Sequence, residues 1–313
     1  MRTIMTMAVA LFFVLSGVAS AAYPTQPITI IIPSKAGGST DTSARIFIKT
    51  AKMHLPGADF VIKNVGGSGG QKGFEEIARA RADGYTIGMI FTTQVVSHIV
   101  ANRARYTLDS FHIIGNMMQD PLIIAVPKNS EIKDMKDFAA AAKARTLTVA
   151  VNGIGSDDFV AAKKYENYAG VSFNLMPTKG STEQKSLVLG GHVDASFMNL
   201  TQMHGQHKAG DARIIALLDT TRSEVIPDVP TAEEQGVPVS MTAVRGFVAP
   251  TGLDKEVADT LDRLLVEVMN DPEFIDDCKK DTMILLPMEG GEFLAYLKDL
   301  QAETQKFYES TPW

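Results

Sequence analysis

The chain has a single cysteine, Cys278, and a single tryptophan among its 313 residues. One cysteine cannot form an internal disulfide, so packed hydrophobic cores must stabilise the folded state. Hydrophobic residues make up 45% of the chain and charged residues 21%, an ordinary globular composition, and the length is sufficient for two domains. The formal net charge of −6 argues against nucleic acid or an anionic membrane surface as a partner.

An apolar segment at the N-terminus is too short to span a membrane. It runs from Met5 to Leu15 behind the basic start Met1-Arg2, and the small residues Ala19-Ser20-Ala21 follow. A spanning helix needs about 20 apolar residues. The pattern is typical of a secretory signal peptide over residues 1–21, cleaved near Ala21–Ala22. We therefore expect a periplasmic protein without direct membrane insertion.

Motifs for metal and dinucleotide chemistry are missing or incomplete. The sequence has no Cys-x-x-Cys or His-Glu-x-x-His motif, and Gly153-Ile154-Gly155 lacks the third glycine of a dinucleotide-binding loop. His204 and His207 stand at helical spacing, which a solvated helix face explains better than a metal site. We therefore predict no metal, no cofactor and no nucleic-acid partner.

A glycine cluster around Ser68 matches the Gly-x-Ser-x-Gly elbow of serine hydrolases. In those enzymes the elbow follows a central strand, whereas here it follows only the second predicted strand. A mobile glycine loop has the same composition. A secreted hydrolase that uses Ser68 is kept only as an alternative, and we predict that the protein is not an enzyme.

Strands and helices alternate along the chain, with glycine-containing loops between them. The apolar strand Pro27–Pro33 leads through a short loop into a helix that begins at Ser39 or Thr40, and the same order recurs. Such alternation predicts an α/β fold with parallel or mixed sheets flanked by helices. Further strands are predicted at 60–62, 85–91, 121–127, 147–151, 173–176, 193–197 and 246–250, and further helices at 73–81, 135–144, 159–168, 182–189, 255–270 and 291–309.

The alternating pattern restarts after the strand at 121–127, and the strand at 246–250 ends in a proline turn. We therefore place two crossings between lobes, near residues 122–127 and 244–250. The first lobe would contain residues 22–122 and 248–313, and the second would contain residues 123–247. Two crossings predict a hinged, two-lobed molecule with a ligand cleft between the lobes.

Several loops rich in glycine and hydroxyl side chains lie at predicted strand ends. A helix N-terminus presents unpaired N–H groups and the positive end of the helix dipole, which favour an anion. Simple helix capping explains any one loop. Their repetition at the carboxyl ends of parallel strands favours a binding site. The candidate ligand-binding residues are Gly38, Ser39, Thr40, Asp41, Thr92, Thr93, Gly155, Ser156, Asp157, Lys179 and Gly180.

Arg245 is a further candidate because it lies in the otherwise apolar stretch 242–248. A buried guanidinium needs a partner. It could hold a ligand carboxylate through two parallel hydrogen bonds. A structural ion pair with one of the 36 acidic residues is the alternative, and both interpretations stay open.

With these loops in place, the sequence resembles the substrate-binding proteins of tripartite tricarboxylate transporters, also called Bug or TctC-like receptors. The resemblance extends over nearly the whole mature chain, and the order of the matching segments is specific to the family. These segments are Tyr23-Pro24, 27–33, Ala36-Gly37-Gly38-Ser39-Thr40-Asp41, 64–73, Asp83-Gly84-Tyr85-Thr86, 189–194, 227–231 and 249–252.

The resemblance implies a type II-like periplasmic-binding-protein fold with a carboxylate held in the cleft between the lobes. By position, residues 38–41 and 155–157 would grip that carboxylate. The resemblance also implies delivery to a membrane permease with one large and one small subunit, and we expect the receptor to be a monomer. A periplasmic sensing subunit for a membrane kinase is the alternative function.

Arg245 occupies a position that is often aromatic in this family and basic in some members. A basic residue there favours a second acid group on the ligand over an amino group, which would need a carboxylate partner. We therefore expect a dicarboxylate or tricarboxylate, with Arg245 binding its distal acid group.

Overall fold

The computed structural model describes residues 23–313. The predicted signal peptide at residues 1–21 lies outside this range. Within residues 23–313, every helix is too short or too polar to cross a lipid bilayer.

The first part of the chain alternates strands and helices, as predicted. The first helix begins at Ser39, one of the two predicted starts. Helix α3 was not predicted. The elements are β1 (Ile28–Ile32), α1 (Ser39–His54), β2 (Phe60–Asn64), the 3₁₀ helix η1 (Ser68–Gly70), α2 (Gln71–Arg79), β3 (Thr86–Phe91), α3 (Gln94–Val100) and the 3₁₀ helix η2 (Leu108–Ser110).

The middle of the chain begins with the longest strand, of which only the second half was predicted. Strand β8 was missed. The elements are β4 (Phe111–Pro127), α4 (Met135–Ala144), β5 (Thr148–Val151), α5 (Asp157–Ala169), β6 (Asn174–Pro177), α6 (Ser181–Leu189), β7 (Ala195–Asn199), α7 (Leu200–Ala209) and β8 (Ala212–Leu218).

The last part contains one more long strand and two long helices near the predicted positions. The shorter elements α9 and β10 were not predicted. The elements are β9 (Thr242–Pro250), α8 (Lys255–Met269), α9 (Pro272–Lys280), β10 (Ile284–Glu289) and α10 (Gly290–Ser310).

The strands form one continuous mixed sheet, which confirms the α/β prediction. Their order is β2-β1-β3-β9-β4-β7-β5-β6, and β8 and β10 also pair with β4. The outer strands pair in parallel, whereas β9 and β4 run antiparallel to their neighbours. Strand β4 makes the sheet continuous, because its residues 111–121 pair with β9 and its residues 122–125 pair with β7.

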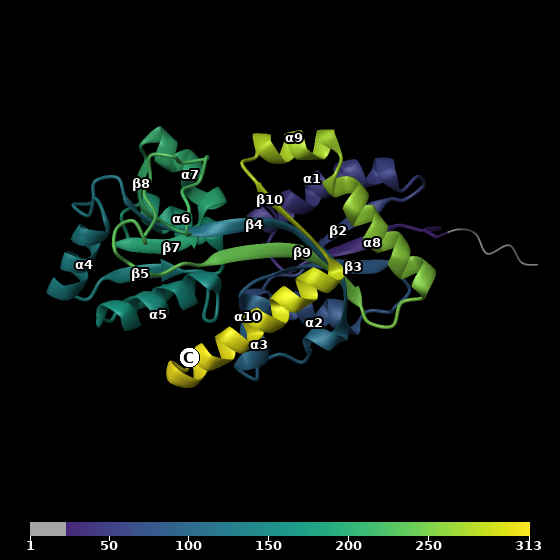
Figure 1. The fold of residues 1–313 in the computed structure, drawn as a ribbon, viewed down its shortest axis with the longest axis horizontal. Helices are drawn as coiled ribbons and strands as arrows, with labels where there is room; N and C mark the ends of the chain where they lie inside the picture. The colour runs from purple at the N-terminus through teal and green to yellow at the C-terminus, as the bar shows by residue number, and fades with distance from the viewer. Residues whose placement is uncertain (1–22) are drawn as a thin grey trace, which may run out of the picture.

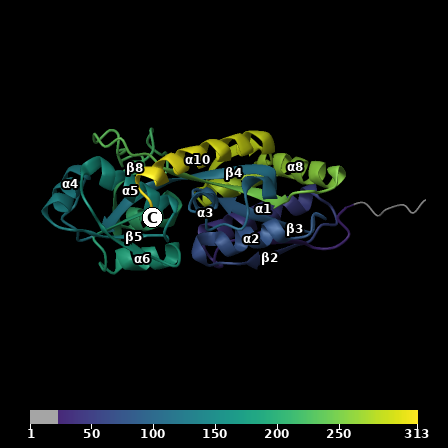
Figure 2. The same ribbon diagram turned by 90° about the horizontal axis from the view of Figure 1, so that it is seen from below.

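Two groups of elements lie around the two ends of this shared strand (Figures 1 and 2). Helices α4 to α7 cover one side, and α1, α2, α8 and α9 cover the other. Met241 lies where β4 changes its pairing partner from β9 to β7. Its N–H donates to the carbonyl of Leu218 in β8, and its carbonyl accepts from the N–H of Leu122 in β4. From Arg245 to Val248, β9 already pairs with β3. We therefore propose two lobes, with the return crossing just before β9 and thus a few residues earlier than the predicted 244–250.

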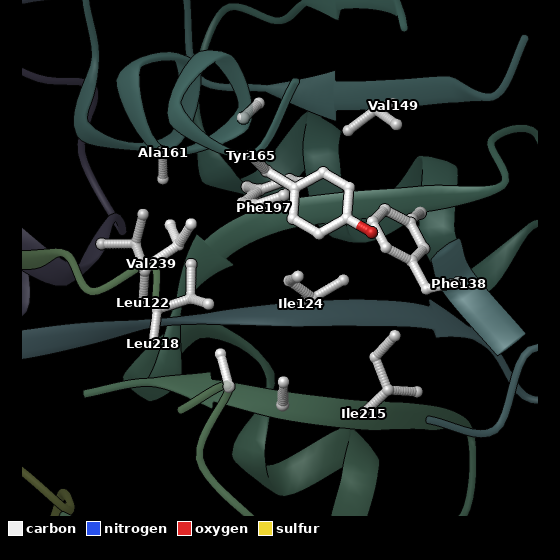
Figure 3. Close-up of a cluster of buried hydrophobic side chains, with 14 of the residues drawn as sticks. Leu122, Ile124, Phe138, Val149, Ala161, Tyr165, Phe197, Ile215, Leu218 and Val239 are labelled. Atoms are coloured by element: carbon white, nitrogen blue, oxygen red, sulfur yellow. The ribbon is translucent and has the colours of Figure 1, made fainter. Parts of the chain in front are cut away.

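The core of the α4–α7 side is built around packed aromatic rings (Figure 3). The rings of Phe138 and Tyr165 lie 5.1 Å apart, and both side chains are buried together with Phe197. Burial of each such side chain contributes roughly 1.5–3 kcal/mol to folding. The core therefore anchors α5 on the sheet, with its N-terminus at the carboxyl end of β5.

The opposite core anchors α1. Phe47 of α1 packs on Phe247 of β9, with ring centroids 4.3 Å apart, and on Phe274 of α9 at 6.4 Å. These contacts hold α1 against the sheet, so that its first turn lies at the carboxyl end of β1.

The C-terminal segment connects the two groups of elements. Trp313, which follows α10, packs against Phe159 of α5, with centroids 5.8 Å apart, and against Tyr308 at 4.8 Å. Arg103, which follows α3, donates to the backbone oxygen of Trp313 at 3.1 Å. Figures 1 and 2 both place the C-terminus beside α5.

Candidate functional site

A cavity of about 230 Å³ lies between elements from the two sides of the molecule. Helix α1, strand β4 and the loop between α9 and β10 contribute from one side, and helices α6 and α7 contribute from the other. The lining residues are Gly37, Gly38, Ser39, Thr42, Met118, Ser181, Thr182, Lys185, Thr201, Gln202, His204, Asp281 and Met283.

Two helices begin at this cavity without a side-chain cap. The N-cap residues of α1 and α6 are Gly38 and Gly180, and no side chain accepts a hydrogen bond from either first turn. The free N–H groups and the helix dipole therefore favour an anion at both places. Ser39, Ser181 and Thr182 add hydroxyl donors, and they line the same cavity.

Asp41 builds the loop before α1. Its carboxylate accepts hydrogen bonds from the Gly37 N–H at 3.0 Å, from Arg45 Nε at 2.9 Å and from Asn64 Nδ2 at 3.0 Å. Burial would raise the pKa of Asp41, but the hydrogen bonds from Arg45, Gly37 and Asn64 outweigh it and lower the pKa. The buried, ionised side chain thus holds Gly37 and Gly38 in place.

Helix α5 differs from α1 and α6 because the side chain of its own N-cap residue caps the first turn. The hydroxyl of Ser156 accepts from the Phe159 N–H at 3.0 Å. Burial raises the pKa of Asp157, and burial together with the charge of Asp157 raises the pKa of Asp158 well above its ordinary value. Asp157 accepts from Gln94 of α3 at 3.2 Å and from Asn199 at 2.9 Å.

Arg245 forms an ion pair in the interior. Its Nη1 lies 2.8 Å from Oδ2 of Asp120, and the two side chains are 4% and 0% exposed. Asp120 also accepts from the backbone N–H of Thr201 at 3.1 Å and from its hydroxyl. Because Thr201 lines the cavity, Arg245 and Asp120 support its wall from behind.

A second hollow, of about 350 Å³, lies at the start of β4, α8 and α10. Its lining includes His112, Gly252 and Gly290, and every lining residue belongs to the side that contains α1. The smaller cavity is the stronger candidate because it joins both sides and collects two uncapped helix N-termini.

Comparison with known proteins decides the family. The model for the tripartite tricarboxylate transporter family receptor, TctC, matches residues 44–309. The chain belongs to this receptor family. Members are substrate-binding receptors and not enzymes, which removes the support for a hydrolase that uses Ser68. Ser68 itself lies exposed in the short helix η1.

Individual members of the TctC family and related structures agree with the assignment. A UPF0065 protein from the TAR-I ttuE-ttuC' intergenic region of Agrobacterium vitis is 29% identical over 81% of this chain and 74% of its own length. The periplasmic binding protein BugD is 26% identical with a TM-score of 0.83, over 92% of this chain and 98% of that one. MatC from Rhodopseudomonas palustris, solved with bound malate, is 22% identical over 91% of this chain and 99% of that one, and with a TM-score of 0.84 it shares the fold.

In this TctC receptor the cavity gathers two of the predicted ligand-binding residues, Gly38 and Ser39. The others lie outside its lining. Thr92 is buried, and its hydroxyl accepts from the Val244 N–H at 2.9 Å. Lys179 is exposed beside α6. Ligand roles for these outlying residues stay predictions; they are Thr40, Asp41, Thr92, Thr93, Gly155, Ser156, Asp157, Lys179, Gly180 and Arg245.

Several lining residues were not predicted. Gly37 precedes the predicted Gly38, and Ser181 and Thr182 follow the predicted pair Lys179 and Gly180, so the two loops themselves were a usable signal. The remaining residues gave no signal because they resemble ordinary helix and strand positions; they are Thr42, Met118, Lys185, Thr201, Gln202, His204, Asp281 and Met283.

The two histidines of α7 differ in their surroundings. His204 lines the cavity, and its Nε2 lies 3.0 Å from the hydroxyl of Thr282. His207 accepts at Nδ1 from the Ile214 N–H at 3.2 Å. The prediction of a solvated helix face is therefore wrong for His204. Within residues 23–313, no three His, Cys, Asp or Glu side chains lie together as a metal site would require.

Proposed function

We propose that this TctC receptor is periplasmic and captures a small carboxylate in the cavity between α1 and α6. It then delivers the ligand to a membrane permease with one large and one small subunit. The receptor acts as a monomer and changes no covalent bond of its ligand.

The position of the two uncapped helix N-termini carries this proposal. Helix α1 belongs to one side of the molecule and α6 to the other, and both begin at the cavity. An anion between them accepts hydrogen bonds from both sides and is stabilised by both dipoles. Binding therefore favours a closed arrangement of the two lobes, which a permease can recognise.

The position of Lys185 supports a ligand with more than one acid group. Lys185 lies one turn into α6 and supplies a cation to the cavity. Arg245 is already paired with Asp120, so it is less available than Lys185 for a distal carboxylate. A dicarboxylate or tricarboxylate that extends from α1 toward Lys185 satisfies both helix N-termini and this ammonium group.

Thermal-shift measurements on the mature chain from Ala22 onward test the proposal. Monocarboxylates, dicarboxylates, tricarboxylates, amino acids, sugars and nucleotides are compared. At one hundred times its dissociation constant, a ligand that binds only the folded state adds about 2.7 kcal/mol of stability. We expect stabilisation by carboxylates alone. Binding only of sugars or nucleotides would overturn the assignment to an anion.

A pair of lysine variants locates the site. Lys185→Gln removes a cation from the cavity lining, whereas Lys208→Gln removes one from an exposed position on α7 outside the lining. We expect Lys185→Gln to weaken dicarboxylate binding by about tenfold, as loss of a charged hydrogen bond commonly does. Lys208→Gln should leave it nearly unchanged. Equal effects would place the ligand elsewhere.

A further inference from the structure

Three buried carboxylates and one buried cation lie together behind the cavity. Asp120, Asp157 and Asp158 are at most 2% exposed. Among residues 23–313, Arg245 is the only buried lysine or arginine, and it pairs with Asp120 at 2.8 Å. The hydrogen-bond partners of Asp157 and Asp158 are neutral. Two neighbouring carboxylates that are removed from water disfavour each other's ionisation, so this pair is a place where a proton can be held.

The hydrogen bonds of Asp158 leave one of its oxygens free. Oδ2 accepts from Nε2 of Gln184 at 2.9 Å and from the Asn152 N–H at 3.0 Å. Nε2 of Gln184 also donates to the carbonyl of Phe197 at 2.8 Å, which fixes the orientation of this amide. Within residues 23–313, Oδ1 of Asp158 and Oε1 of Gln184 are both buried without a donor. Buried acceptors nearly always have one, and a proton on Oδ1 makes this oxygen a donor.

Helix α7 connects the cavity with two of these carboxylates. Thr201 lines the cavity and donates to Asp120 through its backbone N–H, at 3.1 Å, and through its hydroxyl. Gln202 also lines the cavity, and its Nε2 donates to Oδ1 of Asn199 at 2.8 Å. Nδ2 of Asn199 in turn donates to Asp157 at 2.9 Å. Asp120 is therefore in direct contact with the cavity wall, and Asp157 is one side chain behind it.

Helix α6 connects the cavity with Asp158. Gln184, the hydrogen-bond partner of Asp158, lies between the lining residues Thr182 and Lys185. An anion in the cavity is thus separated by a thin layer of side chains from a cluster with excess negative charge. Like charges repel strongly where the local dielectric constant is low, and proton binding removes one of them.

We propose that capture of an anion in the cavity is coupled to uptake of a proton at Oδ1 of Asp158. This inference rests on the proposed capture of a carboxylate. Burial, followed by the charges of Asp157 and Asp120, already raises the pKa of Asp158 well above its ordinary value, and a bound anion acts in the same direction. The complex then holds a proton that the free receptor has released, so affinity for the anion increases as the pH falls.

The other charged groups around the pair remain the same in a variant of Asp158. Arg245 of β9 and Asp120 of β4 act on the pair from the sheet. Lys185 and His204 line the cavity, as does Asp281 in the loop between α9 and β10. Any pH dependence that these groups contribute is common to the native protein and the variant, so the difference between the two isolates Asp158.

Calorimetric titration in buffers of different ionisation enthalpy tests the inference. The tightest binder among acetate, succinate and citrate is titrated between pH 6 and pH 9, with correction for the protons that the free acid carries. We expect net proton uptake and a dissociation constant that rises about threefold to tenfold per pH unit over part of this range. Infrared difference spectra of the native protein should gain the carbonyl band of a protonated carboxylic acid on binding.

A matched pair of variants assigns the proton. Asp158→Asn replaces the protonated acid with a neutral amide of the same shape. It should bind the same acid more tightly than the native protein at pH 9 and take up few protons at any pH. Asp211→Asn removes a carboxylate from an exposed position after α7 and should keep the native uptake. If Asp158→Asn fails to fold, the infrared band of the native protein decides.

The outcomes separate this inference from the proposed function. Binding without proton uptake, or without the infrared band, would overturn the coupling and leave carboxylate capture intact. Uptake that persists unchanged in Asp158→Asn would place the proton on another group and would also overturn it. Absence of binding by all three acids at every pH would overturn carboxylate capture, and the coupling with it.

Discussion

Nη1 of Arg245 lies 2.8 Å from Oδ2 of Asp120, and both side chains are almost completely buried. Removal of one partner leaves an uncompensated charge in the interior, which typically costs about 3–5 kcal/mol. We therefore expect Arg245→Met to lower the free energy of unfolding by this amount. The double variant Arg245→Met with Asp120→Leu should recover much of the loss. Urea denaturation measures both, and a fully additive double variant would contradict the ion pair.

The same arginine has a predicted role in ligand binding that needs a separate measurement. If Arg245 binds a distal acid group, Arg245→Ala should lose far more affinity for dicarboxylates than for monocarboxylates. If it only supports Thr201 through Asp120, the two losses should be equal. Titration of the folded fraction of the variant with both classes distinguishes these roles.

Because of Asp158, the free energy of unfolding should decrease as the pH rises. Its pKa is raised in the folded state by burial and by the charge of Asp157. The folded protein therefore holds a proton that the unfolded chain has released, and this contribution is present below the unfolded pKa and lost as pH increases. Asp158→Asn should be more stable than the native protein at pH 8, and the difference should shrink toward pH 4. Urea midpoints across this range test it.

Asp41 should show the opposite dependence. Its pKa is lowered overall, against the effect of burial, by hydrogen bonds from Arg45, Gly37 and Asn64. Its stabilising contribution is therefore present above the unfolded pKa and lost as pH falls through the folded pKa. At pH 7, Asp41→Ala leaves buried donors without an acceptor and should cost about 1–3 kcal/mol.

A matched variant distinguishes the contribution of the buried Asp41 carboxylate from that of its exposed ion pair with Arg45. The Arg45 side chain is 58% exposed, so Arg45→Ala should cost much less than Asp41→Ala. Asp41→Ala should also weaken ligand binding, because the carboxylate positions Gly37 and Gly38 at the cavity. Similar losses for both variants would show that the exposed ion pair is the main contribution.

The alternation of strands and helices was predictable because it depends on local sequence. Apolar runs, glycine loops and capping residues located the starts of α1 and α5 within one or two residues. The antiparallel centre of the sheet was not predictable in this way. Pairing of β4 with β9 joins residues more than a hundred positions apart, and β8 and β10 likewise pair with β4 over long separations in sequence.

The candidate site was only partly predictable for the same reason. Gly38 and Ser39 carry a local signal, since a glycine loop before a helix favours an anion wherever it occurs. His204 carries none, because a polar residue on a helix has the same pattern whether it faces solvent or a cavity. Its environment depends on Thr282, 78 positions further along the chain. The partner of Arg245 likewise could not be selected from 36 acidic residues.

Trp313 packs on Phe159 of α5, and its backbone oxygen accepts a hydrogen bond from Arg103 of the other group of elements. It is the only tryptophan in the chain. Indole emission depends on local polarity, so any movement of α5 relative to α3 changes the fluorescence of this one residue. Trp313 is therefore an intrinsic fluorescent probe, and stopped-flow fluorescence can follow closure of the proposed lobes in the unlabelled protein.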